Sequence, residues 1–110
     1  MIKVIVIGDV FANAGIRALR QTMPGLKEKY QSDFYIANGE NVTGGRGLNH
    51  ADAKQLFDLG VDAITMGNHV WTKMEIHNFI ESEPRVLIPA NLPDGLPGHR
   101  YINIKRMRNH

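Results

Sequence analysis

The sequence contains no cysteine among its 110 residues. This absence excludes a disulfide framework, a thiolate zinc site, an iron–sulfur cluster and a cysteine nucleophile. No stretch approaches the roughly 18 consecutive apolar residues that a membrane-spanning helix requires. The apolar start at residues 2–7 is also too short for the core of a signal peptide. We therefore expect a cytoplasmic protein without a membrane partner.

The sequence also lacks a large excess of charge of either sign. Its 13 basic and 11 acidic residues leave a formal net charge of only +2. A hydrophobic share of 43% and a charged share of 22% are typical of a single compact globular domain. The basic excess falls at the end of the chain, where residues 105–110 form a basic tail behind a domain at residues 1–104. Such a tail could contact RNA, although a solvated terminus is the preferred interpretation.

Strand-like and helix-like segments alternate along the chain. We predict strands at residues 3–7, 33–37, 62–66 and 85–88, with a fifth possible at 101–105, and helices at 14–30, 49–59 and 72–82. The continuous apolar run at 3–7 is typical of a strand buried on both faces. This β-α-β-α-β-α-β order predicts an α/β fold, a parallel sheet with right-handed crossovers.

Local signals refine the three predicted helices. Pro24 falls inside the first of them, so two consecutive helices or a kink are both possible. Asn49 is placed to cap the second helix. Thr72 and Glu75 have the spacing of a capping box, which predicts a helix from residue 72 to about residue 82.

Polar residues follow three of the predicted strands: Asp9, then Glu40 and Asn41, then Asn68 and His69. Ligands of open α/β sheets bind beyond the carboxyl ends of the strands, so these side chains are expected to share one rim. Carboxylate and amide oxygens suit Mg²⁺, Mn²⁺ and Fe²⁺, with zinc also possible. A divalent ion would also relieve the repulsion between the two carboxylates.

A glycine-rich loop at residues 44–47 follows the second of these motifs. It lacks the spacing of a phosphate-binding P-loop, so a flexible loop is the preferred interpretation. Arg46 within it is nevertheless a candidate contact for a substrate phosphate.

Taken together, the motifs Gly8-Asp9, Gly39-Glu40-Asn41 and Gly67-Asn68-His69 resemble the first three signatures of calcineurin-like metallophosphoesterases. The similarity is greater to the bacterial 2′,3′-cyclic-nucleotide 2′-phosphodiesterases, which also share residues 89–93, and it extends over most of residues 1–102. It implies the N-terminal half of a four-layer αββα fold. It also implies a phosphodiesterase acting on cyclic nucleotides or related phosphate esters with two divalent metal ions, Fe, Mn, Mg or Zn.

The resemblance also implies roles for individual residues. Asp9 would bind the first metal ion, Glu40 would bridge the two ions, and Asn68 would bind the second. Asn41 would lie beside the ions or contact the phosphate. His69 would be the catalytic residue that protonates the leaving oxygen.

Two departures from the family qualify these expectations. The sequence has no His-x-His pair, which supplies later metal ligands in the family, and Ala12 stands where a glycine is usual. Half of the fold would expose an apolar sheet face, so we expect a homo-oligomer or marginal stability. Two alternatives therefore stay open: a catalytically inactive half-domain with a binding or structural role, and a nucleotide or RNA binder.

Overall fold

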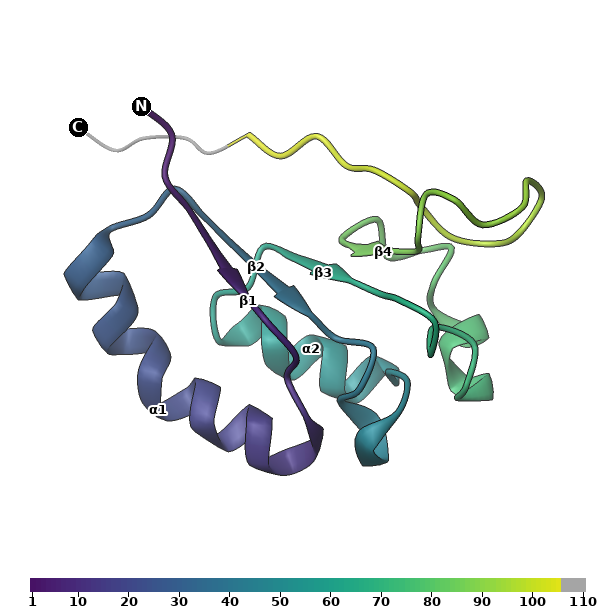
Figure 1. The fold of residues 1–110 in the computed structure, drawn as a ribbon, viewed down its shortest axis with the longest axis horizontal. Helices are drawn as coiled ribbons and strands as arrows, with labels where there is room; N and C mark the ends of the chain where they lie inside the picture. Colours follow the sequence, from purple (N-terminus) through teal and green to yellow (C-terminus); the bar gives the residue numbers. More distant parts are fainter. Residues whose placement is uncertain (106–110) are drawn as a thin grey trace.

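The computed structural model describes residues 1–105 and contains one parallel four-stranded sheet with helices in its connections (Figure 1). The strands lie side by side in chain order: β1 (Val4–Ile7), β2 (Phe34–Asn38), β3 (Ala63–Thr65) and β4 (Val86–Leu87). The connections contain α1 (Ala12–Tyr30), the 3₁₀ helix η1 (Thr43–Gly45), α2 (His50–Asp58) and the 3₁₀ helix η2 (Met74–Asn78). The predicted α/β class with a parallel sheet is confirmed.

Strand register places the ends of the first three strands at one level. Ile7 of β1 pairs with Ala37 of β2, and Asn38 of β2 pairs with Thr65 of β3. The residues that follow these strands therefore leave the sheet at the same edge, as expected for parallel strands.

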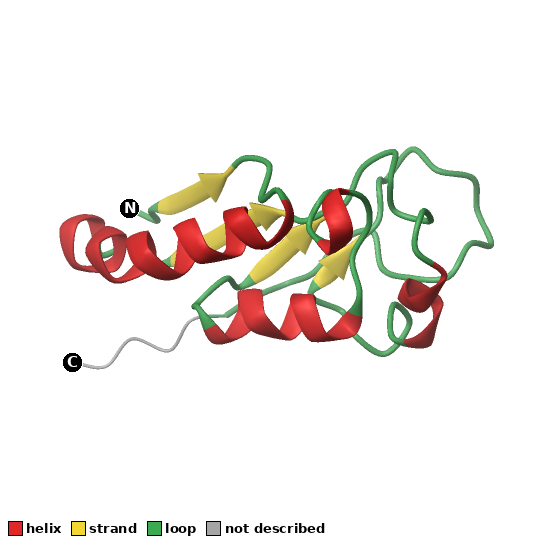
Figure 2. Ribbon diagram, turned by 90° about the horizontal axis from the view of Figure 1, so that it is seen from below, coloured by secondary structure: helices red, strands yellow, loops and turns green. Residues whose placement is uncertain are grey.

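Both α-helices cover the same face of the sheet (Figure 2). The core on that face is built from apolar side chains of both helices and of alternate strand positions, among them Leu19 and Met23 of α1, Leu56 of α2, Ala37 of β2 and Ile64 of β3. Burying these side chains is the main source of stability for a small domain.

The opposite face of the sheet is largely open, and the strand at residues 3–7 was wrongly expected to be buried on both faces. Val4 and Val6 of β1 are 46% and 73% exposed. The extended segment at residues 101–105 runs along this face, where Ile102 and Ile104 line a shallow apolar hollow with Phe34 and other strand residues. The hollow has no second layer of helices over it in the described part of the chain.

The segment at residues 101–105 is not a fifth strand, which corrects that expectation. A single bridge instead joins His99 to Leu87, where the Ile88 N–H donates to the His99 carbonyl at 2.8 Å. The predicted basic tail at 105–110 lies, apart from the exposed Lys105, outside the described residues.

The first helix is continuous, so the sequence signal at Pro24 produces neither a break nor a second helix. It ends at Tyr30, and the capping residue Gln31 has left-handed backbone angles and donates its N–H to the Lys27 carbonyl. Its first residue, Ala12, has a φ of 53°, a left-handed conformation that is costly for any residue with a side chain. No helix in residues 1–105 is both long and apolar enough to cross a bilayer.

Of the two other predicted helices, the one at residues 49–59 forms and the one at residues 72–82 does not. Asn49 caps α2 as predicted, accepting a hydrogen bond from the Asp52 N–H at 2.8 Å. The predicted helix at 72–82 is wrong, because only the short η2 forms and Thr72 does not cap it. Ile76 and Ile80 are both fully buried, so packing of this segment into the core overrides the capping signal.

An ion pair shapes the turn before β4. Arg85 donates from Nε and Nη2 to the two carboxylate oxygens of Glu83 at 2.9 and 2.8 Å. These hydrogen bonds lower the pKa of Glu83 and raise that of Arg85. Arg85 directly precedes β4, so the pair lies away from the edge of the sheet where the motifs of Asp9, Glu40 and His69 follow their strands.

Candidate functional site

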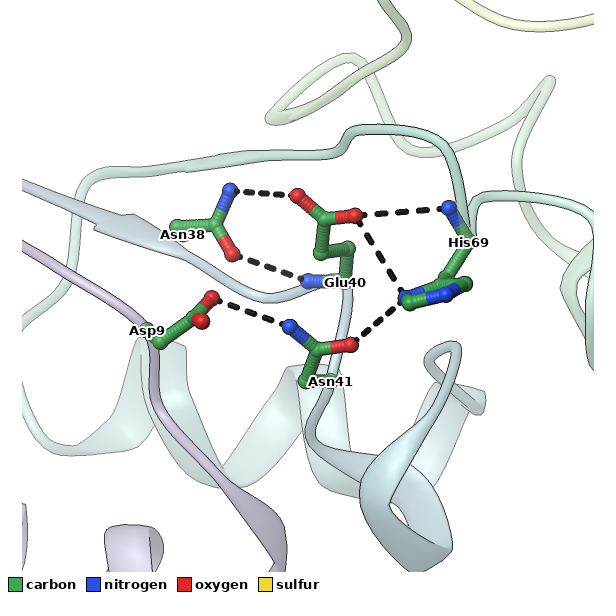
Figure 3. A network of polar contacts seen from close by, with 5 residues as sticks. All are labelled: Asp9, Asn38, Glu40, Asn41 and His69. Carbon is green, nitrogen blue, oxygen red and sulfur yellow. Dashed lines mark hydrogen bonds and ion pairs between the residues drawn. The ribbon is translucent and has the colours of Figure 1, made fainter.

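Four of the singled-out side chains meet at the carboxyl edge of the sheet (Figure 3). Asp9 follows β1, Glu40 and Asn41 follow β2, and His69 follows β3. Backbone hydrogen bonds hold these loops together, because the Ala12 N–H donates to the Asn41 carbonyl at 3.1 Å and the Gly39 N–H to that of Thr65 at 2.9 Å.

A linear chain of hydrogen bonds joins Asp9, Asn41 and His69 (Figure 3). Asn41 Nδ2 donates to Asp9 Oδ1 at 3.0 Å, and Asn41 Oδ1 lies 2.7 Å from His69 Nδ1. An ionised carboxylate only accepts, so the Asn41 amide must turn its NH₂ toward Asp9 and its oxygen toward the imidazole. With the amide in this orientation, Nδ1 of His69 is the donor of that hydrogen bond, and Nε2 is left for other partners.

Glu40 is held from two sides. Its Oε1 accepts a hydrogen bond from Asn38 Nδ2 at 3.2 Å, and its Oε2 accepts one from the backbone N–H of His69 at 3.3 Å. The same Oε2 lies 3.7 Å from His69 Nδ1. A Cβ atom on Gly67 would overlap the Glu40 carboxylate, so the absence of a side chain at residue 67 makes room for it.

Asn68 and Arg46 stand apart from this network. Asn68 neighbours His69 in the chain, but its side chain is exposed and makes no hydrogen bond with the other site residues in the part that the structure describes. Arg46 is exposed on the glycine-rich loop. The structure thus brings together Asp9, Glu40, Asn41 and His69, while Asn68 and Arg46 lie at the periphery.

The donor set suits a hard divalent cation in its chemistry, because it consists of carboxylate and amide oxygens. Within residues 1–105, however, no three His, Cys, Asp or Glu side chains are grouped so that they could hold one ion. Amide oxygens or water would therefore have to complete any coordination shell formed by this part of the chain.

The glycine-rich loop is packed between two side chains that the sequence analysis did not assign to the site. A Cβ on Gly45 would lie 3.3 Å from two ring carbons of Phe11. On Gly47, a Cβ would lie 2.7 Å from Cγ of Lys73. Both glycines have positive φ, 92° and 83°, and their missing side chains allow this close approach. Neither contact has a sequence signature beyond the glycines themselves.

Asn38 was also missed as a contributor to the site. It directly precedes the Gly39-Glu40-Asn41 motif, and its side-chain amide orients Glu40. Its position as the last residue of β2, two residues before Glu40, is the signal that could have indicated this contact.

The chain is similar to known proteins in both sequence and structure. The 2′,3′-cyclic-nucleotide 2′-phosphodiesterase of Bacillus subtilis is 43% identical over 103 residues, which span 94% of this chain and 39% of that protein. A crystal structure of a hypothetical protein from Thermus thermophilus superposes with a TM-score of 0.81 at 41% identity, covering 89% of this chain and 38% of that one.

A phosphatase structure from Mycoplasma pneumoniae superposes similarly, with a TM-score of 0.82, 35% identity, and coverage of 89% of this chain and 36% of the other. The chain thus spans less than half the length of the relatives that it matches. The model of the YmdB-like protein family matches residues 5–110. The chain belongs to the YmdB-like family.

Proposed function

We propose that this chain supplies one part of a divalent-metal-dependent phosphodiesterase site that acts on cyclic nucleotides or related phosphate esters. The main support for this proposal is the network in which Asp9, Asn41 and His69 are hydrogen-bonded in series beside the Glu40 carboxylate. The name of the Bacillus relative supports this reaction class.

Two divalent ions would be held by oxygen atoms of Asp9, Glu40 and Asn41, together with Asn68 if its exposed side chain turns toward the rim. A divalent ion, when bound, neutralises phosphate charge and lowers the pKa of water. Each protein residue has a separate task in this proposal. Glu40 is kept in place by Asn38 and by the His69 N–H, so that its carboxylate stays on the rim.

His69 is the candidate proton donor to the leaving oxygen. Nδ1 is engaged by Asn41, which leaves Nε2 for the substrate. To act as the acid, His69 would have to carry a second proton on Nε2, as an imidazolium, and would return to the neutral Nδ1–H form when the leaving oxygen takes that proton. Arg46, exposed on the glycine-rich loop, is a further candidate contact for the phosphate. Homo-oligomer formation is proposed from the exposed apolar face of the sheet. Binding of a nucleotide or RNA, with the basic tail as a contact, is a separate alternative that rests on the sequence alone.

The metal assignment is tested by Mn²⁺ titration calorimetry on the chain and its Asp9→Asn variant. We expect the affinity to fall at least about tenfold, since even the loss of a residue that supports a metal ligand has an effect of that size. Asp94→Asn, which changes a fully exposed carboxylate, is the matched control and should bind Mn²⁺ like the wild type. Equal affinity of the Asp9→Asn variant would contradict the site.

Turnover of an aryl phosphodiester in the presence of Mn²⁺ tests the catalytic role of His69. We expect His69→Ala to reduce turnover by about 10²- to 10⁴-fold, the usual contribution of a general acid, while Mn²⁺ affinity stays within about twofold. Wild-type turnover that resists both EDTA and this substitution would reject the proposal. A chain that binds Mn²⁺ without any turnover would instead support the inactive half-domain.

A further inference from the structure

Phe11 is an aromatic side chain left in solvent beside the polar network. It is 60% exposed, whereas Tyr35 and Phe79 are 5% and 4% exposed in the core. It follows Asp9 by two residues and precedes α1. A single exposed apolar side chain is ordinary on a protein surface, so what matters here is how firmly this one is held.

The backbone on both sides of Phe11 is tied to the loop that carries the site. The Val10 N–H donates to the Asn38 carbonyl at 3.2 Å, and the Ala12 N–H donates to the Asn41 carbonyl at 3.1 Å. Ala12 adopts its unfavourable φ of 53° within this arrangement. Backbone strain of this kind persists only where the surrounding structure imposes it, and it concentrates at functional sites.

The ring itself is supported by the glycine-rich loop. Two of its carbons lie against Gly45, close enough that a Cβ on Gly45 would be 3.3 Å from each. Gly45 in turn lies in η1, four residues after Asn41. Phe11 is therefore an aromatic side chain that contacts Gly45, is 60% exposed, and is attached to backbone that is hydrogen-bonded to the loop of Asn41.

We infer that Phe11 is a specificity-determining residue that stacks on the nucleobase of a nucleotide whose phosphate lies at the network of Asp9, Asn41 and His69. The inference rests on the proposed function, and it narrows the substrate class to phosphate esters that carry an aromatic base. Stacking tolerates any base because every base has a π-face. The residue therefore selects nucleotides over sugar phosphates without selecting among bases.

Binding measurements on the full chain in Mn²⁺ test the inference with three probes: 2′,3′-cyclic AMP, ribose 5-phosphate and inorganic phosphate. Phe11→Ala and Phe11→Leu should each weaken binding of the cyclic nucleotide about 5- to 100-fold, the range found for removing a stacked aromatic. Binding of the two base-free probes should stay within about twofold. Phe11→Leu keeps an apolar side chain against Gly45, and Phe11→Trp should retain nucleotide binding.

The possible failures are distinguishable from one another. Loss of affinity for all three probes in the Phe11→Leu variant, or unchanged affinity for the nucleotide, would overturn the role of Phe11 and leave the proposed function standing. A wild-type chain that binds none of the three probes would overturn the proposed function together with this inference.

Discussion

Ala12 combines an unfavourable backbone conformation with a position as the first residue of α1, directly after Phe11. Its φ of 53° costs a residue with a Cβ atom roughly 1–2 kcal/mol. Glycine pays no such steric cost but loses more conformational entropy on folding.

The substitution Ala12→Gly should therefore stabilise the chain by about 0.5–1 kcal/mol, the difference between these two effects. Urea denaturation followed by circular dichroism measures this change. Ala18→Gly, at an exposed position inside the same helix, is the matched control and should cost about 0.5–1 kcal/mol. Destabilisation by both substitutions would show that residue 12 is not held in the left-handed region in solution.

At the residue scale, the sequence predicted that polar side chains after three strands lie at one edge, because parallel strands bring their carboxyl ends together. Asn68 was predicted with them, but its exposed side chain lies outside the hydrogen-bonded network. Asp9, Glu40, Asn41 and His69 are all adjacent to strand ends, so topology alone brings them close. Phe11, Asn38 and Lys73 were not predicted, since their contacts depend on loop conformation and on which glycine each side chain approaches.

At the scale of secondary-structure elements, a capping residue matters only if the helix that follows it forms. Asn49 precedes α2 and accepts a hydrogen bond from the Asp52 N–H. Thr72 has an equally good sequence context but makes no capping hydrogen bond, and η2 begins after Lys73.

The two capping signals should differ in their effect on stability. Asn49→Ala should cost about 1 kcal/mol, the usual value for a lost N-cap, and Thr72→Ala less than about 0.5 kcal/mol because it is an exposed surface change. Thermal denaturation of both variants measures this difference. A cost of about 1 kcal/mol for Thr72→Ala would indicate that a capped helix forms there in solution.

Sequence patterns predicted the elements well where local and tertiary preferences agree. For the strands at the centre of the sheet and for α2, the local preference and the tertiary packing favour the same structure. The segment at 72–82 has a local helix signal, but Ile76 and Ile80 must enter the core from the short connection between β3 and β4. The continuity of α1 through Pro24 was left open by the sequence, because proline has different consequences at different places in a helix.

At the scale of the whole molecule, the two faces of the sheet are unequally covered. Helices cover one face, while Val4, Val6 and the hollow beside Ile102 and Ile104 lie on the other. In residues 1–105, β1 pairs with β2 alone, so its outer edge is unpaired as well. An apolar face next to an unpaired edge favours association between chains.

A charge placed on this face should therefore reduce self-association. We expect Val6→Lys, at a side chain that is 73% exposed, to shift the chain toward monomer in sedimentation velocity experiments over a range of concentrations. Gln21→Lys adds the same charge at an exposed position of α1 and should leave the association unchanged. Monomeric wild type at every concentration, or equal association of the Val6→Lys variant, would contradict this expectation.

The amide of Asn41 gives the site a spectroscopic property. Because Asp9 fixes the orientation of this amide and the amide fixes the proton of His69 on Nδ1, the nitrogen NMR shifts of the imidazole report on a carboxylate that it does not touch. A change of tautomer at His69 would indicate that the Asn41 amide has turned, although the Glu40 carboxylate, 3.7 Å from Nδ1, also favours a proton on that nitrogen.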